Sequence, residues 1–421
     1  MAKPKLALIP AAQGTKFYSV LPSDGSGDFT FARGSVATRI NAQGLIENVA
    51  SGVSRLNYPM IDGVVKGCPH HILEPARTNY IPYSEDFSNA AWTKFGGGTG
   101  AVPIVTLNQG ISPDGTNNAT RIEFSIAAGT TTSDQSIVLD SVTVPSADTT
   151  QKSIYLKSNT SNSYELIIYE STNASGTNVK KITVTTEWKR FVVYGAVSST
   201  TSGLAFGLRN INVSGVSQSA DVLVYGAQLE SGSFPTSYIP TSGESGGVTR
   251  SAETATGAGD ASTFNDSEGV LMAEISAENE TSSFARRISI LNTTSNRILI
   301  GAESASSTIR TVITVGGSSK FDVSSSQLVT TNNKIAVKYS SNGSEMYING
   351  FTVGISAIDS SFPSSTLNDL QFGSGNGNSP FYGNTKQLQY FDSALADTQL
   401  EQLTSWQSFR DMANGQLYTI E

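Results

Sequence analysis

Residues 334–354 read KIAVKYSSNGSEMYINGFTVG, and this stretch decides the fold of the last part of the chain. Apolar and polar side chains alternate in IAVKY as they do in a half-buried strand, SSNG supplies a turn, and MYI returns as a second strand. Asn349 and Gly350 are the preferred pair for a tight hairpin, because both residues tolerate a positive φ. The stretch therefore predicts three consecutive antiparallel strands.

The rest of the chain has the composition of many short strands joined by tight turns. Of its 421 residues, 38% are hydrophobic and only 15% are charged, and 39 are glycine. Thr and the aromatic residues favour strands, whereas Gly, Asn and Ser supply turns. The sequence therefore predicts an all-β protein with a small N-terminal β segment, two β-sandwich (jelly-roll) domains and one short C-terminal helix.

Three units follow one another along the chain. Residues 1–68 contain short alternating runs, too few for a large core, and are expected to lean on a partner or on the next domain. Residues 69–244 hold about eight strand-like runs, which suit a two-sheet sandwich or jelly roll. Residues 245–421 form the last unit. The small polar residues at 241–247, TSGESGG, have the composition of a linker.

A family resemblance appears in the last unit. Its closing segment, LQFGSGNGNSPFYGNTKQLQYFDSALADTQLEQL (residues 370–403), gives a strand, a Gly-rich loop, a second strand and leucines at helical spacing after Asp397. Together with residues 334–354, it resembles the laminin-G-like and concanavalin A-like lectin sandwiches. The resemblance implies the fold. That fold hosts sugar-binding lectins, calcium-dependent modules, glucanases and passive structural domains, so it does not choose among them.

Catalysis of the glucanase kind is the alternative that this resemblance raises. Its paired glutamates would have to be Glu274 and Glu278, which have the spacing but lack the flanking aromatic residues of a sugar subsite. A retaining pair must also converge to about 5 Å across a cleft. We expect both glutamates to be surface charges at the end of a strand, and the chain not to be an enzyme.

A calcium site is a second alternative in the same unit. Asp359, Asp369 and Asp392 lie near the carbonyl- and amide-rich loop of residues 373–379. Calcium prefers oxygen ligands that include carboxylates. Turn capping by Asx side chains explains the same residues, and we favour it. No other cofactor is expected.

A second resemblance covers the first two units. The segments FTFARGSVATRINAQGLIENV (29–49), RTNYIPYSEDFSNAAWTK (77–94) and VLVYGAQLESGSFPTSYIPT (222–241) occur in this order. They resemble an N-terminal signature and the two boundaries of a carbohydrate-binding-module-like jelly roll in bacteriophage head and tail appendage proteins. The resemblance implies a virion structural protein, a head fibre, capsid decoration or tail fibre. Residues 1–68 would attach it to the particle.

The same boundary motif holds candidate glycan-binding residues. Trp92, Tyr80 and Tyr83 could form a stacking platform, because exposed rings offer flat apolar area to a sugar face. Packing against Phe234 and Tyr238 in the closing motif is the other interpretation, and the one we favour.

The remaining features narrow the partners. A net charge of −8 with only isolated basic pairs argues against nucleic acid, and no run of about 20 apolar residues suggests a membrane span. The apolar run at the N-terminus stops at Pro10, short of a signal peptide. The lone Cys68 excludes an intrachain disulfide, and with His70 and His71 it makes a poor zinc motif.

The expected setting is therefore the virion. The expected partners are other capsid or tail proteins, further copies of the chain (a trimer before a dimer) and host-surface glycans. A bacterial surface adhesin remains an alternative.

Overall fold

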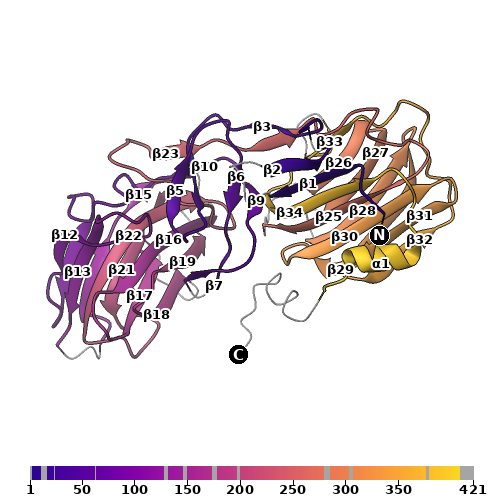
Figure 1. Cartoon of the computed structure of the whole chain (residues 1–421). Helices are drawn as coiled ribbons and strands as arrows, with labels where there is room; N and C mark the ends of the chain where they lie inside the picture. The colour runs from indigo at the N-terminus through magenta and orange to yellow at the C-terminus, as the bar shows by residue number, and fades with distance from the viewer. Residues whose placement is uncertain are drawn as a thin grey trace.

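The computed structural model describes residues 2–10, 17–22, 24–61, 63–127, 131–145, 149–172, 178–196, 200–278, 285–302, 307–375 and 379–407. Two β-sandwiches lie side by side, and strands from the N-terminal segment run between and along them (Figure 1). Within the described residues, the one α-helix is α1 (Asp397–Thr404). The predicted all-β fold class is confirmed.

The first sandwich consists of two five-stranded antiparallel sheets. One sheet contains, in spatial order, β11 (Thr93–Gly97), β14 (Gln135–Leu139), β21 (Leu204–Arg209), β17 (Tyr164–Glu170) and β18 (Val179–Val184). The other contains β12 (Ile104–Gly110), β13 (Ala119–Ser125), β22 (Ser219–Ser231), β16 (Thr149–Ser158) and β19 (Lys189–Ala196).

Strand alternation explains how the first sandwich fills its core. On β13, Ile122 and Phe124 point inward and are buried, whereas Arg121 and Glu123 face outward. Successive side chains of a strand point to opposite faces, so each strand gives one apolar row to the core and one polar row to solvent. Residues in the outward-facing row of the sheet that contains β12, β13 and β22 line the candidate site.

The second sandwich pairs a nine-stranded sheet with a five-stranded sheet. The main path of the large sheet is β2 (Phe17–Leu21), β1 (Leu6–Pro10), β34 (Gly383–Phe391), β25 (Gly269–Ala277), β30 (Asn333–Ser340), β31 (Gly343–Ile348) and β32 (Phe351–Ser356), and β9 (His70–Leu73) joins β34 and β6 (Arg55–Asn57). The smaller sheet contains β29 (Ser318–Leu328), β28 (Thr308–Val315), β27 (Asn296–Ala302), β26 (Arg286–Thr293) and β33 (Asp369–Gln371).

The stretch that decides this fold forms the predicted strands. Residues 334–354 contribute β30, β31 and the start of β32, and Ile348 pairs with Phe351 across a two-residue turn. Asn349 has φ 51° and Gly350 has φ 89°, the positive values that such a hairpin requires. The helix α1 covers the outer face of the large sheet, where Leu400 is fully buried against Met272 and Tyr347.

Five two-stranded pieces complete the described structure. They are β4 (Ala37–Ile40) with β5 (Ile46–Val49), β7 (Met60–Ile61) with β8 (Val64–Val65), β3 (Thr30–Ala32) with β24 (Thr254–Thr256), β10 (Arg77–Asn79) with β23 (Val248–Arg250), and β15 (Val142–Thr143) with β20 (Thr201–Ser202).

The N-terminal segment is interleaved with both sandwiches and does not form a unit of its own. β1, β2 and β6 belong to the large sheet of the second sandwich, and Leu6 and Leu8 are part of its core. The β4–β5 hairpin instead packs on the first sandwich, where Ile46 contacts Tyr225 and Tyr238. The physical reason is the one that composition suggested, since residues 1–68 are too few to bury their own apolar side chains.

A buried cluster of charges joins the two sandwiches, and we call it the junction cluster. Its members are three arginines and two glutamates: Arg33, Arg55, Arg250, Glu74 and Glu253. Arg55 contacts Glu74 at 2.7 Å, Arg33 contacts Glu253 at 2.7 Å, and Arg250 contacts Glu74 at 2.7 Å. All five side chains are at most 4% exposed, so the cluster excludes water.

The predicted linker at residues 241–247 is held at both of its ends, although residues 242–246 are exposed. Thr241 is buried and its hydroxyl donates to the carbonyl of Ile81 at 2.6 Å. Gly247 lies so close to the chain that an added Cβ would stand 2.1 Å from the carbonyl oxygen of Asn79. Glycine at position 247 permits this close backbone approach, which composition cannot distinguish from flexibility.

Candidate functional site

The predicted stacking platform lies largely inside the first sandwich. Trp92 is 1% exposed, its rings pack against Phe87 and Phe206, and its indole N–H donates to the carbonyl of Tyr83 at 2.8 Å. Tyr80 and Tyr83 are half-buried against the same core. A sugar needs an open ring face, and the buried Trp92 offers none. A stacking platform made of all three residues is therefore not present.

Phe234 and Tyr238 of the closing motif contact the opening motif through Arg77 and Ser84. Tyr238 packs against Tyr225, with ring centroids 5.5 Å apart, and its hydroxyl bonds Ser84. Phe234 lies under the guanidinium of Arg77, 5.2 Å from its ring centroid. The two boundary motifs therefore meet through Tyr238 and Ser84, and Trp92 packs within the core that they close.

The three candidate calcium ligands lie on separate segments, each with its own hydrogen-bond partner. The carboxylate of Asp359 caps its own turn by accepting from Ser361, Asp369 accepts from the backbone N–H of Gly257, and the backbone carbonyl of Asp392 accepts from Asn265. No group of three or more His, Cys, Asp or Glu side chains in the described part of the chain is arranged to hold a metal. Residues 376–378 of the candidate loop lie outside the described residues, and the calcium site stays a prediction.

The two glutamates of the glucanase alternative lie on and just past β25. Glu274 lies on the outer face of β25 and accepts from Asn332 at 3.0 Å and Gln387 at 2.7 Å. Glu274 is only 6% exposed within β25, so the expectation that it is a surface charge at a strand end is wrong. Glu278 lies just past the end of that strand.

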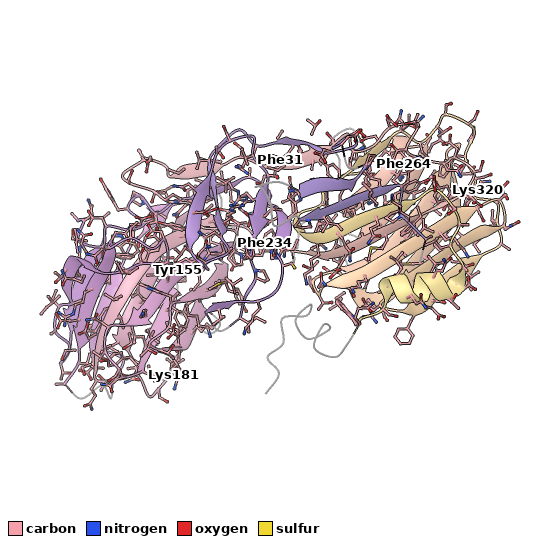
Figure 2. The ribbon with its side chains drawn as sticks, in the orientation of Figure 1. Phe31, Tyr155, Lys181, Phe234, Phe264 and Lys320 are labelled. Atoms are coloured by element: carbon pink, nitrogen blue, oxygen red, sulfur yellow. The ribbon has the colours of Figure 1, made fainter. Side chains whose placement is uncertain are left out.

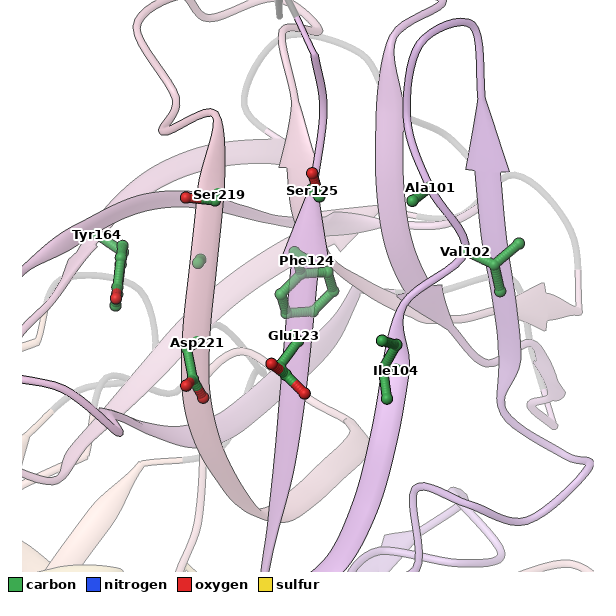
Figure 3. A pocket seen from close by; sticks show the side chains of 10 residues that line it. Ala101, Val102, Ile104, Glu123, Phe124, Ser125, Tyr164, Ser219 and Asp221 are labelled. Carbon is green, nitrogen blue, oxygen red and sulfur yellow. The ribbon is translucent and has the colours of Figure 1, made fainter.

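A solvent-facing hollow of ≈ 290 Å³ opens on the first sandwich beside β12, β13 and β22, and Tyr164 from the opposite sheet also lines it (Figure 3). We call it the sheet hollow. Its lining residues come from the loop before β12 and from β12, β13, β17 and β22: Ala101, Val102, Ile104, Glu123, Phe124, Ser125, Tyr164, Ser219, Ala220 and Asp221.

Strand register builds the floor of the sheet hollow. Ile104 pairs with Glu123 across β12 and β13, and Glu123 pairs with Asp221 across β13 and β22. Directly opposed side chains stand about 4.5–5.5 Å apart, so these three form one row across three strands. Figure 3 shows Tyr164 on one side of this row and Val102 on the other.

The apolar wall of the sheet hollow is open to solvent. Ile104 is 61% exposed and Val102 is 60% exposed, unusually high values for large aliphatic side chains. Tyr164 is half-buried, and its hydroxyl bonds Thr160 at 2.8 Å. These side chains offer apolar area beside polar groups, which is the usual composition of a small-ligand site.

Arg121 fixes the two carboxylates of the sheet hollow. Its guanidinium donates two bonds to Asp221, at 2.8 and 2.7 Å, and one to Glu123 at 2.9 Å. The hydrogen bond from Arg121 lowers the pKa of Asp221. At neutral pH Asp221 is therefore an ionised acceptor for hydroxyl groups, and it does not hold the proton that a general acid requires.

A second cavity, of ≈ 330 Å³, lies between the sandwiches, and we call it the interdomain cleft. Figure 2 shows Tyr155 on the first sandwich and Phe234 near the junction between the two. The residues that line the interdomain cleft come from the N-terminal segment, the first sandwich and the second sandwich: Thr38, Arg39, Ile40, Ile46, Asn57, Tyr58, Pro59, Met60, His70, Ile72, Glu74, Tyr155, Arg190, Pro235, Thr236, Ser237, Tyr238, Glu278 and Asn384.

Three ionisable side chains of the interdomain cleft are strongly perturbed. Burial, with a smaller contribution from Glu74, raises the pKa of Glu278 to about 7, and burial lowers the pKa of His70 to about 3. Burial also disfavours the charge of Glu74, but Arg250 and Arg55 outweigh it and hold the pKa of Glu74 at about 2. Perturbed groups that line a cleft mark a candidate functional site.

His70 and His71 do not gather ligands with Cys68. Both histidines are buried on β9, where neighbouring side chains point to opposite faces, and Cys68 is exposed.

Sequence reasoning named only Glu278, His70 and Tyr238 among the residues of the two cavities, and gave none of them a ligand-binding role there. Glu123 and Asp221 are about 100 residues apart in the sequence, and only the pairing of β13 with β22 brings them together. No strand was expected at Ile104, because most side chains of β12 are exposed on both faces and leave no alternating pattern.

Comparison with known proteins supports the fold of the second sandwich. Residues 256–401 match the family model of the concanavalin A-like lectin/glucanases superfamily. This confirms the predicted sandwich class for that part of the chain. No curated protein sequence gives a significant match.

Similar solved structures share only the coarse fold. The CBM40 domain of the Ruminococcus gnavus IT-sialidase is 16% identical, covers 36% of this chain and 94% of its own, and gives a TM-score of 0.30. A family 11 carbohydrate-binding module from Clostridium thermocellum is 14% identical, covers 41% and 99%, and gives 0.24. Likeness at this level carries no argument about ligand or activity. In the described residues, no helix has the length and apolarity to cross a bilayer.

Proposed function

We propose that this chain is a non-enzymatic attachment protein of a bacteriophage virion, and that its first sandwich binds host-surface glycans in the sheet hollow. The observation that carries the glycan part is the row Ile104–Glu123–Asp221, where an exposed apolar side chain stands beside two carboxylates on one open sheet face.

The chemistry of that row suits a sugar. The C–H face of a pyranose ring can cover Ile104 and Val102, while its hydroxyls donate to Glu123 and Asp221. Arg121 holds both carboxylates in place before a ligand arrives, which lowers the entropy lost on binding. A shallow open site of this size gives weak binding, and several copies on one particle would raise it through avidity.

The virion part rests on the ordered motifs of residues 29–49, 77–94 and 222–241, which resemble phage appendage proteins. The head or tail of the particle, together with further copies of this chain, would supply the protein partners. Residues 1–68 are interleaved with both sandwiches. The surface that attaches to the particle would therefore include residues of the sandwiches as well as of the N-terminal segment.

A glycan array tests the glycan part. We expect the full chain to bind a defined subset of glycans, and Ile104→Ser to weaken that binding at least fivefold because the apolar contact is lost. Ile355→Ser is the matched control, since Ile355 is 71% exposed on the second sandwich. Equal binding by wild type and Ile104→Ser would remove the sheet hollow from the proposal.

Mass spectrometry of purified phage particles tests the virion part separately. We expect peptides of this chain in particles after density-gradient purification, at a ratio to the major capsid protein that stays constant across the particle peak. Their absence from that peak would contradict the virion assignment and favour the bacterial adhesin.

A further inference from the structure

The interdomain cleft is a rigid cavity with an unneutralised cation in its wall. Side chains from the N-terminal segment and both sandwiches line it, and Glu74 of the junction cluster forms part of its floor. The ion pairs of the cluster connect the N-terminal segment with residues beside β9 and β23, and Glu74 also accepts from Ser237, which follows β22 of the first sandwich, so the cleft is shaped before a ligand enters. Its volume of ≈ 330 Å³ falls at the lower end of ligand sites, where one or two sugar rings fit.

Arg190 supplies the cation. Its guanidinium stands 5.6 Å from the ring centroid of Tyr155, donates to the carbonyl of Thr236 at 2.7 Å and donates to the hydroxyl of Ser153 at 2.8 Å. Neither acceptor carries charge, and no carboxylate among the described residues pairs with Arg190. An arginine has five N–H donors, so these two hydrogen bonds leave donors for a ligand.

The other ionisable groups of the cleft do not neutralise Arg190. Arg39 is itself paired with Glu47, and Glu74 is committed to Arg55 and Arg250. Burial also raises the pKa of Glu278 to about 7. An anion entering the cleft below neutral pH therefore meets one unpaired positive charge and a largely protonated carboxyl.

The remaining walls provide groups for hydroxyls and for an apolar ring face. Asn57 and Asn384 carry side-chain amides, and Tyr58 and Tyr155 carry half-buried rings. A guanidinium is planar and matches a carboxylate with two parallel hydrogen bonds.

We propose that the interdomain cleft is a second ligand site, independent of the sheet hollow, that takes a carboxylate-bearing sugar with its carboxylate on Arg190. Amide groups of Asn57 and Asn384 then meet the sugar hydroxyls, and the tyrosine rings border its apolar face.

Ligand-observed NMR with the full chain tests this site. The probes are methyl glucuronide and N-acetylneuraminic acid, with methyl glucoside as the uncharged isostere of the first. We expect saturation transfer to at least one acidic sugar at pH 6 and at least tenfold weaker binding of methyl glucoside. Binding of neither acidic sugar, or equal binding of glucuronide and glucoside, overturns the proposal.

Variants locate the binding. Arg190→Gln should weaken binding of the acidic sugar at least tenfold, and Arg190→Lys, which keeps the charge without the planar fork, at least threefold. Arg209→Gln is the matched control, because Arg209 also lies over a tyrosine ring, Tyr169, but away from the cleft. If either Arg190 variant loses its native circular dichroism spectrum, the other decides the test.

Two further arms separate the possible causes. Ile104→Ser should leave binding of the acidic sugar unchanged, so failure of the sheet hollow and failure of this site can be told apart. Displacement of the bound sugar by an equal concentration of acetate would show recognition of any carboxylate and would contradict a sugar site. Wild-type binding by Arg190→Gln would also contradict it.

Discussion

Glu278 is a carboxyl group whose proton affinity is set by the fold. Burial raises its pKa most, Glu74 and Glu230 raise it further, and Arg286 opposes them, with the result of a pKa of about 7. In an unfolded chain a glutamate titrates near pKa ~4.3. The folded protein therefore holds a proton that the unfolded chain has already released between about pH 4.3 and 7.

This difference predicts a pH dependence of stability. Because the folded state binds more protons in this range, the free energy of unfolding should fall as the pH rises from about 4.3 to 7. Glu278→Gln keeps the neutral form at every pH, so it should remove that fall and exceed wild type in stability at pH 8. Urea unfolding at pH 5, 6, 7 and 8 measures it.

The exposed Glu401→Gln serves as the control for that measurement, since Glu401 lies on the solvent side of α1. If the free energy of unfolding changes with pH between 5 and 8 by the same amount in wild type and in Glu278→Gln, the assigned pKa is contradicted.

Single residues show where sequence reasoning ends. The hairpin residues Asn349 and Gly350 were predicted from their own chemistry, because a positive φ is a local requirement. The roles of Trp92, Glu123 and Arg190 depend on partners distant in sequence, such as Phe206 and Asp221. No local pattern reports such partners, so the candidate site could not be predicted.

At the scale of elements, the turn between β30 and β31 depends on one glycine. Gly343 has φ 121°, and a Cβ added there would stand 2.0 Å from the carbonyl oxygen of Ser356. Gly343→Ala should lower the free energy of unfolding by about 3 kcal/mol or more, from backbone strain and the clash. Chemical denaturation measures it.

Gly316→Ala is the matched control for that turn, because Gly316 also has a positive φ, 57°, but nothing lies within 4 Å of its added Cβ. It should lower stability by only about 1 kcal/mol. Equal losses for the two variants would show that the close approach to Ser356 does not limit the turn.

The helix α1 adds stability through its packing on the large sheet. Leu400 is fully buried against this sheet, together with Leu395. Leu400→Ala should cost about 2–5 kcal/mol of unfolding free energy, because it leaves a cavity under the helix. The exposed Gln402→Ala is its control and should change stability by less than about 0.5 kcal/mol. A loss below about 1 kcal/mol for Leu400→Ala would mean that α1 is only loosely docked.

Most strands that build the two sandwich cores followed from the sequence, and two of the missed strands share a cause. The eight strands expected between residues 119 and 228 correspond to β13, β14, β16, β17, β18, β19, β21 and β22. The missed strands β12 and β29 have mostly exposed side chains, and β29 is rich in serine. Hydrophobic alternation identifies strands that border a core on one face, and these two border little of it.

At the scale of the molecule, the junction cluster connects the unfolding of the two sandwiches. Glu253→Gln removes one carboxylate from between Arg33 and Arg55, and breaking a buried pair costs about 3–5 kcal/mol. Scanning calorimetry should show one transition for wild type and two separated transitions for Glu253→Gln, because each sandwich keeps its own core.

Asp322→Asn breaks a surface pair with Arg310 and is the control for the calorimetry. It should leave a single transition, since exposed pairs contribute about 0–1 kcal/mol. Two transitions in wild type would show that the junction does not couple the sandwiches.

The all-β class with its sandwich sheets was accessible from the sequence, but the course of the N-terminal segment was not. Its short strands carry no signal for which sheet they join, so pairing of β1 with β34 required the three-dimensional structure. The same limit applies to the interdomain cleft, which exists only where three separate segments meet.

Affinity electrophoresis through gels that contain a host-surface polysaccharide tests most directly whether this chain binds glycans without cleaving them. We expect the polysaccharide to slow the migration of wild type, and to slow that of Ile104→Ser less. The polysaccharide should keep its chain length after overnight incubation with the protein. Shortening of the polysaccharide would contradict the absence of cleavage. Wild-type mobility that no host-surface polysaccharide changes would contradict glycan binding.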